Sequence, residues 1–95
     1  MRKVVWLDGA VEDVARLREF IEPHNRQASI RAAKAIQNGA KILEGYPNIA
    51  HPVEEMPDYH DLIIPFGAGN YVLRYRIEGG CVYVIGVRHS REEGA

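Results

Sequence analysis

Residues 71–87, YVLRYRIEGGCVYVIGV, constrain the fold of this chain more than any other stretch. Residues 71–77 alternate large apolar side chains with Val72, Arg74 and Arg76, which is the period-two pattern of a strand with one buried face. Residues 78–80, Glu-Gly-Gly, are a strong signal for a tight hairpin turn. Residues 81–87 are apolar on both faces, as is typical of a central strand. The chain is therefore predicted to contain an antiparallel hairpin with its second strand inside a sheet.

The N-terminal half predicts one strand followed by two helices. Residues 3–7, KVVWL, are rich in β-branched and aromatic side chains, as strands are. Asp8 can cap a helix whose apolar residues recur at spacings of three and four until Pro23 ends it. Asn25 can cap a second helix, and Gly45 followed by Pro47 can end it. The four-residue link between the helices predicts an antiparallel helical hairpin.

The remaining segment predicts a strand bounded by loops. Residues 48–59 contain two prolines and are expected to be irregular, whereas residues 60–66, HDLIIPF, indicate a strand. Residues 67–70, Gly-Ala-Gly-Asn, indicate a loop. The predicted order is β-α-α-β-β-β. This is an α+β fold in one domain, residues 1–95, with the N-terminal helical hairpin packed on a mostly antiparallel sheet.

Composition excludes several classes of protein. A net charge of −1 disfavours a protein that coats nucleic acid through bulk electrostatics, and we expect no direct sequence-specific nucleic-acid binding. No apolar run approaches the ~20 residues of a membrane span, so no membrane partner is expected. The single cysteine, Cys81, excludes an internal disulfide and fits a reducing cytoplasm.

The sequence contains no motif that predicts a catalytic centre, a metal site or a cofactor. The glycine-rich loop at residues 67–70 joins two predicted strands, whereas phosphate-binding loops run from a strand into a helix. The four histidines do not share a ligand-like spacing with one another or with cysteine and acids. Nothing near Cys81 suggests an activated thiolate. No residue is therefore assigned a catalytic role.

The arginines of the C-terminal third are the informative charges. Across the hairpin, Val72 and Arg74 are expected to lie near Val87 and Arg88. Guanidinium groups bind anions and partner proteins through shaped contacts. The predicted target-binding residues are Arg74, Arg76, Arg88, His89 and Arg91. The alternative is that these are ordinary exposed arginines, some of them paired with Glu92 or Glu93.

The segments KVVWL and AVEDVARLREFI, followed by GNYVLRYRIEGGCVYVIGVRHSRE, resemble the RelE/ParE superfamily of bacterial type II toxins. The likeness is greater to the ParE branch, the plasmid-stabilisation toxins, and covers nearly the whole chain. The resemblance implies a toxin that is neutralised by a cognate ParD-like antitoxin. For the ParE branch it implies a non-enzymatic inhibitor that poisons DNA gyrase.

RelE-like members instead cleave ribosome-bound mRNA, and the resemblance implies which positions their chemistry would use. The lysines of the second strand are matched here by Asp61 and Ile63, and the arginine of the third strand by Val72. Only Arg91 matches a residue of the RelE-like pattern, the arginine that follows the fourth strand. Losing several groups that stabilise a charged transition state lowers a rate steeply, because each contributes about 10²–10³. A ribonuclease using His89 and Arg91 stays an alternative, as does a non-toxic module that acts only in an autoregulatory complex.

A docking surface for the antitoxin is predicted on the second helix. One of its two apolar stripes is left over after packing on the sheet and on the first helix, and an amphipathic antitoxin segment could cover it. A strand added to the sheet edge is the second possible mode. The residues predicted to be exposed for this purpose are Ala32, Ala35, Ile42 and Tyr46.

Overall fold

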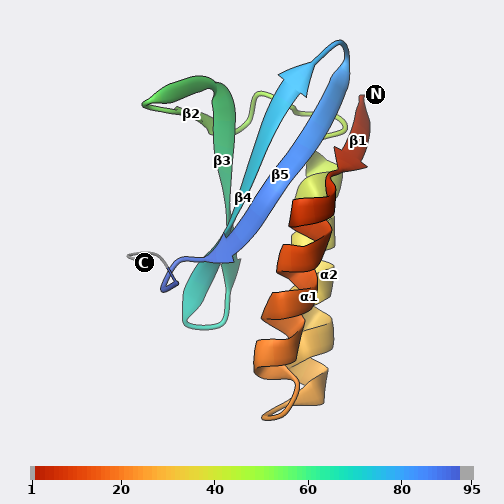
Figure 1. Ribbon diagram of the computed structural model, residues 1–95, viewed down its shortest axis with the longest axis vertical. Helices are drawn as coiled ribbons and strands as arrows, with labels where there is room; N and C mark the ends of the chain where they lie inside the picture. Colours follow the sequence, from red (N-terminus) through yellow and green to blue (C-terminus); the bar gives the residue numbers. More distant parts are fainter. Residues whose placement is uncertain (1, 93–95) are drawn as a thin grey trace.

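The computed structural model describes residues 2–92 and consists of two helices and a five-stranded mixed sheet (Figure 1). The predicted hairpin lies within this sheet. The strand order across the sheet is β1-β5-β4-β3-β2. This α+β arrangement confirms the predicted fold class. The elements in chain order are β1 (Lys3–Trp6), α1 (Asp8–Ile21), α2 (Arg26–Ile42), β2 (His51–Val53), β3 (Met56–Phe66), β4 (Gly69–Glu78) and β5 (Cys81–His89).

The β4–β5 hairpin has the tight turn that its sequence predicts. Gly79 and Gly80 have φ values of 58° and 80°, and Glu78 pairs directly with Cys81. Two successive positive φ angles define a turn whose twist matches that of the flanking strands, and glycine adopts them without a steric penalty. The turn therefore fixes the register of the hairpin from its closed end.

One irregularity interrupts this register. Tyr75 pairs with Val84, whereas its neighbour Arg74 pairs with Gly86, so β5 carries one extra residue, Ile85. Because side chains alternate between the two faces of a strand, one extra residue shifts the alternation beyond the bulge by one position. On β5 the buried positions accordingly shift from Val82 and Val84 to Val87.

The sheet places its helices on one face. The helical hairpin runs beside the sheet, with α1 packed along β5 and α2 against β3 and β4 (Figure 1). Tyr71, Leu73 and Tyr75 of β4 are buried in the common core, as their alternation predicts. The opposite face, called the open face below, carries the side chains that alternate with them on β4.

Both helix starts involve predicted residues, but only one cap forms. Asn25 caps α2, because its side-chain oxygen accepts a hydrogen bond from the backbone N–H of Ala28 at 2.9 Å. The predicted cap at Asp8 is wrong, since α1 begins at Asp8 and Leu7 occupies the cap position. Asp8 lies instead in the first turn, where a carboxylate favours the helix dipole. None of the helices in residues 2–92 is long and apolar enough to span a membrane.

The expectation of an irregular segment over residues 48–59 is wrong in part. β2 pairs antiparallel with β3 through His51↔Asp61 and Pro52↔His60, and β3 already begins at Met56. Proline is tolerated in a strand at the edge of a sheet, where its missing N–H is not needed. The prolines therefore concealed an edge strand that only its pairing with β3 reveals.

Gly39 provides a test of how closely α2 approaches β3. A Cβ atom at Gly39 would lie 2.6 Å from Cδ1 of Ile64, whereas a Cβ atom at Gly45 would meet no atom within 4 Å. We expect Gly39→Ala to lower the free energy of unfolding by about 1–3 kcal/mol, because Ile64 must repack, although alanine usually favours a helix. Gly45→Ala is the matched control and should leave stability unchanged or slightly raised. Urea denaturation measures both, and equal effects of the two substitutions would contradict the close approach.

Candidate binding surfaces

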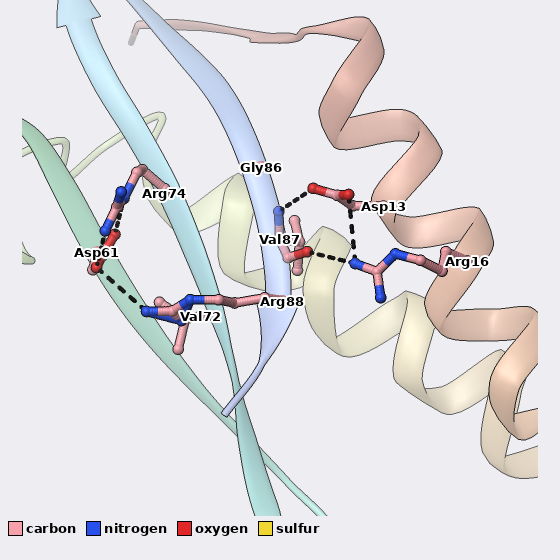
Figure 2. Close-up of a pocket in the computed structure, with 8 residues that line it drawn as sticks. All are labelled: Asp13, Arg16, Asp61, Val72, Arg74, Gly86, Val87 and Arg88. Carbon is pink, nitrogen blue, oxygen red and sulfur yellow. Dashed lines mark hydrogen bonds and ion pairs between the residues drawn. The ribbon is translucent and has the colours of Figure 1, made fainter. Parts of the chain in front are cut away.

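A carboxylate lies at the centre of the arginines on the open face (Figure 2). Asp61 of β3 pairs across the strands with Arg74 of β4, whose Nε and Nη2 donate to the two carboxylate oxygens at 2.8 and 3.0 Å. The hydrogen bond to Asp61 raises the pKa of Arg74 above its ordinary value. Arg88 of β5 reaches the same carboxylate with a longer contact, 4.0 Å from Nη2 to Oδ2, and its side chain is 44% exposed. Arg74 is therefore oriented and neutralised, whereas Arg88 keeps most of its charge available.

Arg76 is also held by neighbours on the sheet. Its guanidinium lies 5.2 Å from the centre of the Tyr83 ring and 3.3 Å from a carboxylate oxygen of Glu78. The strand register places Tyr59 on its other side. The cation–π contact and the ion pair both keep this arginine close to the sheet surface.

A second polar cluster joins α1 to the edge of β5. β1 ends at Trp6, opposite Val84, so the next part of the β5 edge faces α1 instead of a strand. The carboxylate of Asp13 accepts the backbone N–H of Val87 at 2.9 Å, and Nη2 of Arg16 donates to the carbonyl of Val87 at 3.4 Å. Two side chains one helical turn apart thus replace the hydrogen bonds that a neighbouring strand would make.

The glycine of the bulge allows this approach. A Cβ atom at Gly86 would lie 3.1 Å from Oδ2 of Asp13. Sequence reasoning missed the roles of Asp13, Arg16 and Gly86 here, because no local pattern relates residues more than seventy positions apart. The only signal was that a glycine interrupts an otherwise apolar strand.

These clusters surround a small cavity of about 230 Å³ (Figure 2). Figure 2 shows the Asp61 cluster on one side of β5 and the Asp13 cluster on the other. The lining contains three guanidinium groups and two carboxylates, together with the small or apolar residues Val72, Gly86 and Val87. The charged side chains of this cavity are therefore largely paired with one another.

A larger apolar groove lies at the edge of the sheet where β3 and β5 end and β4 begins. It has a volume of about 860 Å³ and runs between the second half of α1, the β3–β4 turn and the turn that follows β5. Phe20 stands 78% exposed at its border, and burial raises the pKa of the Tyr71 hydroxyl at its base. The apolar lining residues are Leu17, Phe20, Ile21, Phe66, Ala68 and Tyr71, and the charged or titratable ones are Arg16, Glu19, His89, Arg91 and Glu92.

The structure divides the predicted target-binding residues between these two surfaces. As predicted, Arg88 lies opposite Val72, and it shares the open face with Arg74 and Arg76. His89 turns to the other side, where its ring packs edge-on against Tyr71 at 5.3 Å between ring centres. Arg91 follows it, donating its backbone N–H to Nδ1 of His89 at 3.1 Å, and lines the groove. Alternation along β5 separates these neighbours in sequence.

The predicted antitoxin stripe on α2 is not exposed as a whole. Ala32 is only 1% exposed and belongs to the core, so its predicted exposure is wrong. Ala35 is partly buried against the same core, because alanine lets the helices and the sheet approach closely. Ile42 ends α2 and Tyr46 lies beyond it, so the predicted place of Tyr46 on the helix is wrong. The two residues are 47% and 69% exposed, and for them antitoxin binding stays a prediction.

Sequence reasoning also missed the groove itself. Its lining brings Phe20 of α1 together with Phe66 of β3, which lies more than forty residues away in the sequence, so no local pattern indicates it. Among residues 2–92, no group of three or more histidine, cysteine or acidic side chains is placed to hold a metal ion.

Comparison with known proteins gives a consistent result. A family model described as "ParE toxin of type II toxin-antitoxin system, parDE" matches residues 4–94. Two curated relatives from Caulobacter vibrioides are Toxin RelE2, 27% identical over 95% of this chain and 97% of its own length, and Toxin RelE3, 29% identical over 97% and 98%. A solved structure titled "Chromosomal ParDE TA system from P. aeruginosa" has the same fold, with a TM-score of 0.80 and 16% identity over 94% of this chain and 96% of that one.

The Asp13 cluster generates a stability prediction. We expect Asp13→Ala to lower the free energy of unfolding by about 1–3 kcal/mol, because the backbone N–H of Val87 loses its acceptor. Asp13→Asn should retain most of the stability, since an amide oxygen can still accept. Glu12→Ala, which removes the same charge from an exposed position of α1, is the control. The prediction is wrong if chemical denaturation finds Asp13→Ala no more destabilising than Glu12→Ala.

Proposed function

The chain belongs to the ParE toxin family of type II toxin–antitoxin systems, and from that premise we propose that it poisons DNA gyrase by binding it. In this proposal the chain has no enzymatic activity of its own. A cognate ParD-like antitoxin, produced with it in the cytoplasm, holds it silent until that antitoxin is lost.

The position of Asp61 carries the proposal. An RNA-cleaving site needs cations that can stabilise the negative charge of the transition state. Here a carboxylate occupies the centre of the arginine cluster, hydrogen-bonded to Arg74 through both oxygens and within 4.0 Å of Arg88. The next positions along the sheet, Ile63 and Val72, are apolar. A scissile phosphate placed on this face would lie beside the Asp61 carboxylate, which repels it, and this supports a surface for protein binding over one for phosphate chemistry.

Arg88 is the strongest candidate for contact with the target. Arg74 and Arg76 are each held by an acid of the same sheet, at 2.8 and 3.3 Å respectively. The longer contact of Arg88 leaves its guanidinium free to exchange Asp61 for an acid of a partner protein. We therefore assign Arg88 the main contact on the open face and the other two arginines a supporting position beside it.

The antitoxin is proposed to occupy the groove beside α1. A soluble protein rarely leaves a large apolar surface uncovered, and Phe20, Ile21 and Phe66 form such a surface here. Its apolar lining between a helix and two turns, with charged residues beside it, suits an amphipathic helix, a common mode of peptide recognition. Because the groove and the open face are separate surfaces, the antitoxin would silence the toxin by blocking the approach of gyrase from beside the open face, and it would not occupy Arg88 itself.

The names of the curated relatives support an alternative. Both are called RelE toxins, which favours a ribosome-dependent mRNA endoribonuclease using His89 and Arg91. A non-toxic module that only binds its antitoxin for autoregulation is the third possibility. In the structure His89 and Arg91 line the groove, on a different surface from Arg74 and Arg88. An RNA-cleaving site would therefore have to work without those two arginines.

Parallel assays separate these activities. We expect the purified chain to inhibit supercoiling by DNA gyrase and to leave ribosome-bound mRNA intact. Specific mRNA cuts that vanish in Arg91→Ala would overturn the proposal and establish the ribonuclease. If neither assay responds and expression does not slow growth, the chain is the non-toxic module.

Substitution of Arg88 tests which surface contacts gyrase. We expect Arg88→Gln to weaken inhibition about 10- to 100-fold, the effect of losing one charged hydrogen bond. Arg91→Gln makes the same charge change on the groove and should alter inhibition less than about threefold, because a screened surface charge contributes little. The measurement is the concentration that halves gyrase supercoiling, with circular dichroism to confirm folding. Equal losses in both variants would contradict the assignment to the open face.

A further inference from the structure

Arg16 of α1 lines both the small cavity and the apolar groove described above. One of its terminal nitrogens, Nη2, faces Asp13 and the carbonyl of Val87, each at 3.4 Å. The other, Nη1, forms an ion pair with Glu92 in the turn that follows β5. One side of the guanidinium is therefore held by Asp13 and the carbonyl of Val87. The other side pairs with Glu92 at the border of the groove.

Glu92 reaches Arg16 by folding back over the end of β5. One of its carboxylate oxygens accepts the backbone N–H of His89 at 2.8 Å, and its own N–H donates to the carbonyl of His89 at 3.0 Å. The second oxygen pairs with Arg16. The carboxylate of Glu92 thus occupies the polar end of a groove whose floor is apolar.

An apolar segment that fills the groove would remove Arg16 from water on its Glu92 side. Burying a guanidinium is costly unless a carboxylate pairs with it, so in the complex an acid must lie on this side of Arg16, either Glu92 itself or one supplied by the partner. The Arg16–Glu92 pair is solvent-exposed and contributes little by itself, with side chains 48% and 37% exposed. An acid supplied by the incoming segment would pair with Arg16 under cover from solvent, where the same interaction is stronger.

We propose that Glu92 is an internal substitute for an acidic anchor residue of the antitoxin, which displaces it from Arg16 on binding. This rests on the proposed function, in which the antitoxin occupies the groove. It specifies the partner as an amphipathic helix with apolar side chains against Leu17, Phe20 and Phe66 and with one aspartate or glutamate at the Arg16 end. Glu92 then lowers the affinity of the toxin for its antitoxin, because Glu92 competes with the acid of the antitoxin for the guanidinium of Arg16.

Affinity measurements with the full-length chain and its cognate antitoxin test the competition. Glu92→Gln is expected to tighten binding about three- to fivefold, the scale of an exposed ion pair that no longer has to be broken. Arg16→Gln should weaken binding about tenfold or more, since the acid of the antitoxin would be buried without its partner. In the Arg16→Gln background, adding Glu92→Gln should have no further effect, because the two residues act through one contact.

Glu19→Gln is the matched control, since Glu19 also lines the groove and loses the same charge. If Glu19→Gln tightens binding as much as Glu92→Gln does, the effect is general electrostatics and the proposal is overturned. Unchanged or weaker binding by Glu92→Gln overturns it as well, with thermal unfolding confirming that the variant is folded. If the unmodified chain fails to bind the antitoxin, the proposed partnership itself is wrong, which is a different outcome from a failed competition.

Discussion

The register of the β4–β5 hairpin determines where every candidate functional group lies. The Gly79–Gly80 turn fixes this register at one end, and the extra residue at Ile85 adjusts it part of the way along. Together they place Val72 opposite Arg88 and Tyr71 opposite His89. A slip of one residue would exchange the two faces of β4, burying its arginines and exposing its tyrosines. The binding surfaces thus depend on a constraint set largely by two glycines and one bulge.

The bulge also determines how the helical hairpin meets the sheet. Gly86 leaves room for Asp13, and Asp13 with Arg16 completes the hydrogen bonds of β5 where β1 has ended. α1 therefore runs along the edge of the sheet. Its second half then forms one wall of the groove with the β3–β4 turn. The position of the apolar groove therefore depends on this polar contact between α1 and β5.

Two surfaces with different chemistry result from this arrangement. On the open face the arginines are arranged around the Asp61 carboxylate, which neutralises part of their positive charge. The groove combines an apolar floor with charged borders, which suits an amphipathic segment. Arg16 belongs to the lining of both hollows. An antitoxin that changes the pairing of Arg16 would act next to the open-face arginines without covering them.

The sequence by itself determined the elements whose signals are local. Alternation in residues 71–77, the Glu-Gly-Gly turn, the cap at Asn25 and the helix end before Pro23 all act through neighbours a few positions away, so their predictions agree with the structure. The second helix, in contrast, ends at Ile42, before the predicted stop at Gly45 and Pro47. Only the tertiary structure decided the edge strand β2, the burial of Ala32, the division of the arginines between two surfaces and the role of Asp61. Each of these depends on which distant segment lies alongside. Pairing and packing between distant segments leave no periodic trace in the chain.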